Sequence, residues 1–335
     1  MGKNQYLPEK FKERLGQQYP KDFKKILQTF HKRLPVIRVN TLLTNLPVLK
    51  TGLEAKYGIK TKPIPLLPNA LEVATDRAAL TALPEYEDGH FYIQSFASQF
   101  IVKALEPRPG ERILDLCAAP GSKTTQIALQ MEGRGELIAN EPNKDRFFKL
   151  IANIRHQKLD HFIQAKKYPG QNYPAFYPEA FDRVLVDAPC SSESRFTEDP
   201  KTFQYWSAPK VKSLSKLQKK LLSAAVRCTK PGGRVVYSTC SFSPEENELV
   251  VHDALKKHPE LQLQEISAEI PRLPIHTEWN QRSLNPEIAK SLRLFPDQLR
   301  ESFFVAVFKK GETVPGNPQV NKLGKRKKQK YTSTK

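Results

Sequence analysis

The stretch that decides the fold is residues 112–124, which read RILDLCAAPGSKT. The apolar run Ile113 to Leu116 is followed by small residues with one glycine, and helical spacing begins at about Ser122. A buried strand that enters a helix through a turn of small residues is typical of a sheet whose turn comes close to a ligand. The stretch therefore predicts the first strand of an α/β domain and one wall of a ligand site.

The sequence that follows repeats this alternation of short apolar runs and amphipathic segments. It predicts further buried strands at residues 137–139, 162–163, 184–186 and 235–237, and helices at about 122–131, 143–157, 210–229 and 244–257. Strands that alternate with helices favour a doubly wound, mostly parallel sheet with helices on both faces. We therefore expect a Rossmann-like α/β catalytic domain over residues 89–310.

The sequence before this domain predicts a second, smaller unit. Helical spacing over residues 8–31 precedes a strand-like segment at 36–39 and a Pro-rich segment at 63–68. A chain of 335 residues has room for about two domains. We expect a small N-terminal α/β domain over residues 1–88, and a disordered basic tail over 311–335.

The charge of the chain points to a polyanionic partner. It contains 54 Lys and Arg against 35 Asp and Glu, a formal charge of +19. Nine basic residues and one acidic residue lie in 309–335, and nine and three lie in 1–35. Such an excess is typical of nucleic-acid binding. No apolar run approaches the ~20 residues of a membrane span, and the four cysteines lack metal-ligand spacing. We expect a cytoplasmic protein with neither membrane nor metal partners.

The turn after the first strand fits neither common phosphate-binding motif. Ser122 stands where a P-loop requires glycine, and one glycine does not make a dinucleotide fingerprint. Glu141 lies twenty positions after Gly121, at the end of the second predicted strand, where a carboxylate can accept ribose hydroxyl hydrogen bonds. This placement predicts an adenosine-containing cofactor. A charge at the start of the next helix is the alternative role for Glu141.

Two cysteines follow two other predicted strands. Cys190 ends the segment Asp187-Ala-Pro-Cys, and Cys240 lies in Ser-Thr-Cys-Ser at 238–241. Because the carboxyl ends of parallel strands meet at one edge of a sheet, both thiols and Asp187 are expected to share a crevice with the glycine turn. The alternative is that each cysteine is an inert buried side chain, as we expect for Cys228.

These segments together resemble a known family. CAAPGSKT at 117–124, DAPCS at 187–191, and YSTCS at 237–241 with EENE at 245–248 are similar to the signature motifs of the RNA (cytosine-5)-methyltransferases, the Sun/Nol/Fmu group with its bacterial rRNA methylases. Weaker matches complete the resemblance, which spans about residues 6 to 310: residues 38–40, 94–98, 199–200, Trp206, 293–296 and 303–304.

The resemblance implies a cofactor, a substrate and roles for individual residues. The implied cofactor is S-adenosylmethionine, held by Cys117, Ala118, Ala119, Pro120, Gly121, Ser122, Lys123, Glu141, Arg146 and Asp187. Cys240 is the implied nucleophile toward carbon 6 of cytosine, Cys190 assists removal of the carbon 5 proton, and Asp187 holds the base near ring nitrogen 3. The resemblance also implies that the N-terminal domain over residues 1–88 binds RNA. Implied contacts to rRNA or tRNA come from Arg38, Asn40, Pro189 and Arg195. DNA cytosine methylases use the Pro-Cys thiol instead, so two cysteines favour RNA.

The chain also departs from the family pattern. Pro169 stands where an aspartate near the adenine is usual, and Ser191-Ser192-Glu193-Ser194 replaces Ser-Gly-x-Gly, which predicts a stiffer turn over the target base. These departures leave a second function open, that of an RNA-binding or ribosome-assembly factor with little methyltransferase activity. The segment 166–177 mixes lysines with aromatic residues, as an RNA-binding surface does, or forms a connector packed on the core.

Overall fold

The computed structural model describes residues 7–31, 33–196, 204 and 206–312. The predicted match at 199–200 and the predicted tail from residue 313 onward lie outside them. The helices are α1 (Glu9–Gln18), α2 (Phe23–Gln28), α3 (Leu46–Tyr57), α4 (Arg77–Thr81), α5 (Pro84–Glu87), α6 (Phe96–Leu105), α7 (Ser122–Gln130), α8 (Lys144–His156), η2 (Gly170–Ala175), η3 (Glu193–Arg195), α10 (Ala208–Cys228), η4 (Pro244–Glu246), α11 (Glu248–Lys257) and η5 (Pro286–Lys290). The strands are β1 (Val36–Val39), β2 (Thr61–Ile64), β3 (Leu67–Val73), β4 (Phe91–Ile93), β5 (Arg112–Asp115), β6 (Glu136–Asn140), β7 (Ile163–Lys166), β8 (Phe181–Asp187), β9 (Thr229–Thr239), β10 (Leu261–Gln264), β11 (Arg272–Leu273), β12 (Glu278–Trp279), β13 (Arg282–Ser283), β14 (Leu292–Leu294) and β15 (Phe304–Lys310).

The centre of the molecule is the parallel sheet that the sequence predicts. Strands β7, β6, β5, β8 and β9 lie side by side in this order and run parallel. The chain moves from β5 outward to β7 and then returns to β8 on the other side of β5. The strand order therefore reverses between β5 and β8, and ligands of such sheets bind beyond the carboxyl ends at this reversal.

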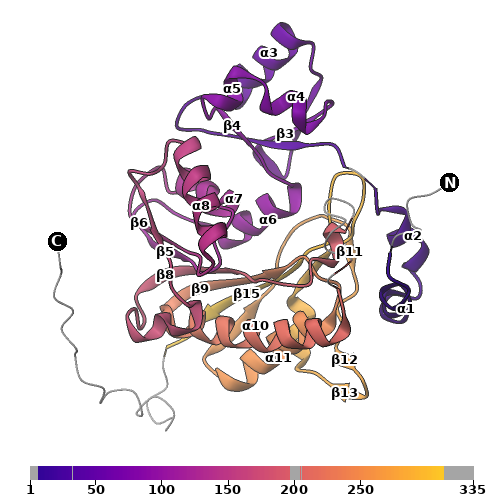
Figure 1. Ribbon diagram of the computed structural model, residues 1–335. Helices are drawn as coiled ribbons and strands as arrows, with labels where there is room; N and C mark the ends of the chain where they lie inside the picture. The colour runs from indigo at the N-terminus through magenta and orange to yellow at the C-terminus, as the bar shows by residue number, and fades with distance from the viewer. Residues whose placement is uncertain (1–6, 32, 197–203, 205, 313–335) are drawn as a thin grey trace.

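The last strand that the sequence pattern predicts is β9, but in the structure the sheet continues beyond it. β15 pairs antiparallel with β9, from Phe304 opposite Thr239 to Lys309 opposite Arg234, and β14, β11 and β10 extend this antiparallel part. Figure 1 shows α6, α7 and α8 over one face of the sheet and α10 and α11 over the other. Both faces are thus covered, which explains the short apolar runs Val184–Val186 in β8 and Val235–Tyr237 in β9.

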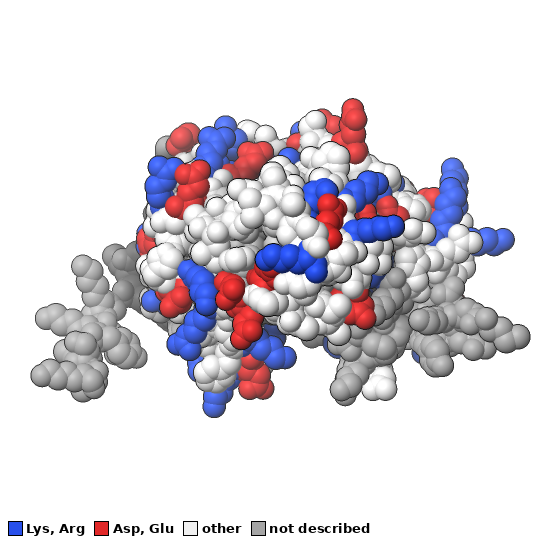
Figure 2. Space-filling model, turned by 90° about the horizontal axis from the view of Figure 1, so that it is seen from above, with Lys and Arg blue, Asp and Glu red and all other residues white. Residues whose placement is uncertain are grey.

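The small domain is a four-stranded antiparallel sheet of order β2-β3-β1-β4. Its last strand, β4, lies beyond the predicted boundary at residue 88, so we propose residues 34–93 for this domain. Those residues contain six Lys or Arg and six Asp or Glu. Figure 2, which views the molecule from above, shows the two signs intermixed on this face. The positive charge of the N-terminal region therefore comes from residues before the small domain.

The first two helices pack on the catalytic domain and not on the small sheet. The segment with helical spacing divides into α1 and α2 around Tyr19 and Pro20. Phe11, Leu15 and Tyr19 are buried in one cluster with Phe196 and Phe242. The Phe11 and Phe196 rings lie 5.0 Å apart in an edge-to-face contact. The N-terminal helices therefore stabilise the loops that follow β8 and β9.

No helix in the described part of the chain is both long and apolar enough to cross a membrane.

Candidate active site

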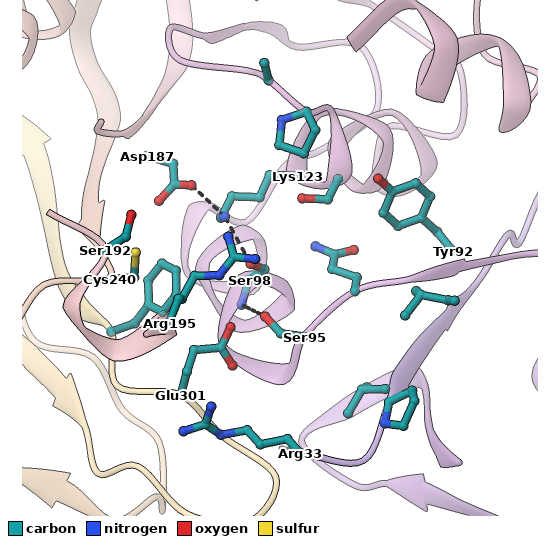
Figure 3. A pocket seen from close by; sticks show the side chains of 18 of the residues that line it. Arg33, Tyr92, Ser95, Ser98, Lys123, Asp187, Ser192, Arg195, Cys240 and Glu301 are labelled. Carbon is teal, nitrogen blue, oxygen red and sulfur yellow. Dashed lines mark hydrogen bonds and ion pairs between the residues drawn. The ribbon is translucent and has the colours of Figure 1, made fainter. Parts of the chain in front are cut away.

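A cavity of about 760 Å³ opens beyond the carboxyl ends of β5, β8 and β9, at the strand reversal. The turn after β5 lines one end of it with Ala119, Pro120 and Ser122, and Cys190 and Cys240 line the other. Figure 3 shows Lys123, Asp187 and Cys240 around this cavity. The sequence prediction that these segments share one crevice is therefore confirmed by the geometry.

The turn between β5 and α7 is held by its own backbone and by β6. The Gly121 amide donates to the Ala118 carbonyl, and the Ala118 amide donates to the Asn140 carbonyl. Gly121 has φ +109°, a conformation that favours glycine, and a Cβ there would lie only 3.0 Å from Leu150 Cδ1. Cys117, Ala118 and Gly121 shape the turn, although none of the three lines the cavity.

Glu141, directly after β6, and Arg146, on α8, support the same turn. Glu141 is buried, accepts a hydrogen bond of 2.9 Å from the Asn143 amide, and forms an ion pair with Arg146. Arg146 lines the cavity and donates to the Ala119 carbonyl at 2.7 Å. Because a carboxylate has about four acceptor positions, Glu141 keeps capacity for further donors.

Asp187 and Lys123 form an ion pair in the middle of the cavity. Lys123 Nζ lies 2.6 Å from Asp187 Oδ2 and also donates to Ser98 Oγ at 3.1 Å. Ser238 Oγ donates to Asp187 Oδ1 at 2.7 Å. Lys123 thus belongs to the cofactor turn by its position in the chain, while its ammonium group lies beside Asp187. Sequence reasoning missed Ser98 and Ser238, although both lie in segments that the resemblance includes.

The thiols of Cys190 and Cys240 are in direct contact, with their sulfur atoms 3.3 Å apart. Cys190 is half-buried and Cys240 is 8 % exposed. The hydrogen bond to Cys240, together with burial, raises the pKa of Cys190 well above its usual range. Burial also raises the pKa of Cys228, to about 12, and this thiol lies on α10 away from the cavity.

Arg38 and Asn40 differ from the prediction that they contact the substrate. Both are buried in the structure, at 2 % and 0 % exposure. Arg38 donates to the Ser122 carbonyl at 2.7 Å and to Thr125 Oγ1 at 2.9 Å. Asn40 donates to the carbonyls of Gly89 and Gln157. Both side chains therefore connect the small domain to the catalytic domain, and their polar groups are used within the protein.

The other two predicted substrate residues, Pro189 and Arg195, line the cavity beside Cys190. Arg33 and Arg77 line the same cavity from the N-terminal side. The cavity thus combines a thiol pair with basic residues from separate parts of the chain. No group of three or more His, Cys, Asp or Glu side chains within the described ranges could hold a metal ion.

The departures from the family pattern have visible consequences. Ser192 adopts the left-handed conformation, φ +57°, which normally favours glycine. Pro169 is exposed, whereas Gly170 is buried where a Cβ would lie 2.9 Å from Leu221 Cδ2. In the segment 166–177, Tyr173 is buried, but Tyr168 and Phe176 are 39 % and 58 % exposed. This segment is thus part connector and part exposed aromatic surface.

The site fits the predicted cofactor. Its volume is within the usual range for small-molecule sites, about 300 to 1,000 Å³. Beneath the turn, Asp115 accepts a hydrogen bond from Thr124 through Oδ2, while its buried Oδ1 has no partner among the described residues. Ala119, Pro120, Ser122 and Arg146 would hold the cofactor at the cavity wall, with Asp187 as an acceptor. Glu141 is buried against Arg146 and does not line the cavity.

Comparison with known proteins agrees with this geometry. Residues 102–309 match the model of the family described as 16S rRNA methyltransferase RsmB/F. The chain is 37 % identical to a tRNA (cytosine(49)-C(5))-methyltransferase of Pyrococcus abyssi, over 90 % of this chain and 97 % of that protein. It is 36 % identical to the 25S rRNA (cytosine-C(5))-methyltransferase nop2 of Schizosaccharomyces pombe, over 82 % of this chain but only 46 % of that protein.

Among solved structures, a methyltransferase homolog protein from Pyrococcus horikoshii superposes with a TM-score of 0.79 at 30 % identity, covering 90 % of this chain and 95 % of that chain. The family match includes Asp187 and the two thiols of the cavity. The chain belongs to the 16S rRNA methyltransferase RsmB/F family and is an S-adenosylmethionine-dependent methyltransferase.

Proposed function

We propose that the protein methylates carbon 5 of a cytosine in RNA through a covalent bond between Cys240 and the base. The observation that carries this proposal is the pair of thiols, 3.3 Å apart, at one end of the cavity that begins at the cofactor turn. Carbon 5 of cytosine is a poor nucleophile by itself. Addition of a thiolate to the neighbouring carbon 6 makes carbon 5 electron-rich. S-adenosylmethionine supplies the methyl group when it is bound.

The two thiols have different roles in this scheme. Cys240 forms the bond to carbon 6. Cys190 acts in its thiolate form and takes the proton from carbon 5 after methylation. The electron pair of that C–H bond restores the double bond between carbons 5 and 6 as the bond from carbon 6 to Cys240 breaks, which releases the methylated base and the Cys240 thiolate. Because carbons 5 and 6 are adjacent atoms, the groups that act on them must lie a few ångströms apart. The separation of the two sulfur atoms supports this assignment.

Asp187 and Lys123 are the groups that orient the base in this proposal. Asp187 is 26 % exposed on its side chain, and Ser238 and Lys123 fix both of its oxygens. Lys123 offsets the negative charge of Asp187, so the carboxylate can face ring nitrogen 3 without repelling the thiolates strongly. Pro189 and Arg195 lie beside Cys190, where they would contact the base and its flanking phosphates.

The substrate in this proposal is rRNA or tRNA in the cytoplasm. A base must leave its stack to enter a cavity of this kind. The family and the relatives named above support RNA as the substrate class. A ribosome-assembly factor that has lost the reaction is the second candidate, because Pro169 and Ser192 depart from the family pattern. The retained thiol pair favours the enzyme.

The test is a covalent trap. Wild-type protein, Cys190→Ala and Cys190→Ala/Cys240→Ala are incubated with total RNA and a labelled methyl donor, with Cys228→Ala as the control on α10. We expect an RNA adduct that resists denaturing electrophoresis in Cys190→Ala, its loss in the double variant, and 5-methylcytosine from wild type and control. If no adduct forms and no RNA is methylated, calorimetry with S-adenosylmethionine is the next measurement. Binding heat would keep a cofactor-dependent function open, and no heat would leave only the RNA-binding or assembly factor. Methylation of duplex DNA would refute RNA as the substrate.

A further inference from the structure

The segments that carry the two thiols are tied to each other by two buried glutamates. Glu193 follows Cys190 in the chain but accepts hydrogen bonds from the segment after Cys240. Glu246 follows Cys240 but accepts hydrogen bonds from the residue after Cys190. Glu193 is 1 % exposed and Glu246 is 0 % exposed. Each loop thus supplies the carboxyl group that holds the other loop.

The donors around Glu193 favour its ionised form. Its Oε2 accepts from the amides of Phe242 at 2.7 Å and Ser243 at 3.0 Å, and its Oε1 accepts from Trp206 Nε1 at 2.8 Å. Amide and indole N–H groups cannot accept hydrogen bonds. Oε1 also accepts from Ser243 Oγ at 2.7 Å, and Oε2 from Ser241 Oγ at 3.0 Å. Each oxygen of Glu193 thus faces at least one N–H group, and the ionised form satisfies all five contacts.

The surroundings of Glu246 are different, because its two oxygens face different partners. Oε1 accepts from the Ser191 amide at 3.0 Å and from Gln218 Nε2 at 2.9 Å. Oε2 forms its short contact with the Ser191 hydroxyl, and the Ser191 amide is more distant from it, at 3.4 Å. A hydroxyl can accept as well as donate. Glu246 is contacted by Ser191 and Gln218, whereas Glu193 accepts five hydrogen bonds, so Glu246 Oε2 is the position that carries a proton at the lower cost.

A chain of hydroxyls connects the two carboxyl groups. Ser191 Oγ lies 3.0 Å from Ser241 Oγ, and Ser241 Oγ lies 3.0 Å from Glu193 Oε2. We name Glu193, Ser191, Ser241 and Glu246 the cysteine brace. Burial, and then the charge of Glu193, raise the pKa of Glu246 to about 7, which agrees with one neutral and one ionised member.

We propose that Glu193 and Glu246 are positioning residues that share a single negative charge, with Glu193 ionised and Glu246 neutral, and that the cysteine brace holds the two thiols at reacting distance. This inference rests on the proposed function. It is also specific to one protonation pattern, in which Glu246 donates to Ser191, Ser191 donates to Ser241, and Ser241 donates to Glu193.

The brace acts directly beside the thiols. Ser191 follows Cys190, Ser241 follows Cys240, and the Ser194 amide donates to the Cys240 carbonyl at 3.0 Å. A second buried negative charge would repel Glu193 and separate the two loops. It would also oppose ionisation of Cys190, because an ionised Glu246 adds to the causes that raise the pKa of this thiol.

The protonation pattern predicts opposite outcomes for two matched substitutions. In Glu246→Gln the amide oxygen can accept from Ser191 and Gln218, and the NH₂ can donate to the Ser191 hydroxyl as the neutral acid does. In Glu193→Gln the NH₂ must oppose an N–H group, which costs about 1–3 kcal/mol. We expect kcat for RNA methylation to change less than about 3-fold in Glu246→Gln and to fall roughly 10-fold or more in Glu193→Gln, with KM little changed. Glu245→Gln, one residue away and paired with Arg14 outside the brace, is the control.

A second variant separates loss of the charge pattern from loss of folding. Trp206→Phe keeps an aromatic ring but removes the indole N–H from Glu193 Oε1. Adding Trp206→Phe to Glu193→Gln should therefore restore part of kcat, because the glutamine NH₂ no longer faces a donor. No restoration, together with equal losses in Glu193→Gln and Glu246→Gln, would overturn the inference.

A direct measure of thiol spacing needs no catalysis. Phenylarsine oxide bridges two thiols a few ångströms apart and releases one water, and its capture is measured by mass. Wild type and Glu246→Gln should capture it at the same rate, Glu193→Gln should capture it more slowly, and Cys190→Ala should not form the bridged product. If wild type methylates no RNA, the proposed function fails, whereas the capture rates still test the brace. Equal capture by wild type and Glu193→Gln would refute the brace even in an active enzyme.

Discussion

Replacement of Arg293 by methionine is expected to destabilise the protein more than any loss of a surface ion pair. Arg293 and Glu248 form an ion pair of 2.7 Å in which both side chains are 0 % exposed. Arg293 also donates to the carbonyls of Ser241 and Phe242, directly after Cys240. The pair thus connects β14 to the loop that carries the proposed nucleophile.

The magnitude follows from what the substitution leaves behind. An ionised Glu248 without its partner costs about 3–5 kcal/mol. The Ser241 carbonyl keeps a second donor, Asn247 Nδ2 at 2.9 Å. The Phe242 carbonyl loses its hydrogen bond from the Arg293 guanidinium, which adds about 1 kcal/mol. The methionine side chain fills most of the arginine volume, so a cavity contributes little. We expect a total loss of about 4–6 kcal/mol in the free energy of unfolding.

The assay is urea unfolding at pH 7, followed by tryptophan fluorescence. Arg134→Met is the matched control, because Arg134 pairs with Glu132 at the surface with both side chains more than 60 % exposed, and we expect it to lose less than about 1 kcal/mol. The double variant Arg293→Met/Glu248→Met should be more stable than Arg293→Met alone, since it leaves no buried charge. The reasoning is refuted if Arg293→Met and Arg134→Met lose the same stability.

Three further predictions address other parts of the site. Lys123→Met should lower kcat about 100-fold, the usual effect of losing one oriented donor. Lys103→Met, on the exposed side of α6, is the control and should leave kcat unchanged. Equal kcat values for the two variants in steady-state methylation assays would contradict this prediction. Phe11→Ala should cost about 3–5 kcal/mol and alter Trp206 fluorescence, because the two rings lie 5.7 Å apart; an unchanged urea midpoint would argue against the packing of α1. Burial raises the pKa of Asp115 to about 7, above its value in the unfolded chain. Its contribution to stability is therefore complete below about pH 4 and is lost as the pH rises through 7. Between these pH values the free energy of unfolding of the wild type should fall by more than that of Asp115→Asn, and parallel curves for the two proteins would reject this prediction.

The sequence predicted the parts of the fold that depend on local pattern. The parallel strands and the helices after them appear as continuous apolar runs and amphipathic segments, because these elements are buried on both faces or on one. The antiparallel strands β10 and β14 were missed, since strands of three or four residues between irregular segments carry little periodic signal. β15 was missed although it is as long as β8 and begins with an apolar run that could have indicated a strand. The convergence of Cys190, Cys240 and Asp187 was predictable for the same reason as the parallel strands: it follows from topology alone.

Side chains that act between domains could not be assigned in this way. Arg38 and Asn40 look like exposed polar residues in a basic region, but their partners, Ser122 and Gln157, are more than 80 positions away in the sequence. Glu193 is an equally clear case. Its sequence context shows only the loss of a glycine-rich turn, whereas its donors come from Trp206 and from the loop after another strand. No local pattern records such partners.

The loop that carries Cys240 is held from three sides, and this restraint has a chemical reason. Glu193 binds the amides of Phe242 and Ser243, Arg293 binds two carbonyls of the same loop, and Asn247 binds the Ser241 carbonyl. A nucleophile and a base that act on adjacent ring atoms lose rate steeply when either moves by an ångström. The two cysteines come from different strands and are not linked to each other covalently. Their relative position therefore depends on buried polar contacts, which is why variants of Glu193 and Arg293 should affect the thiol spacing although neither residue contacts the base.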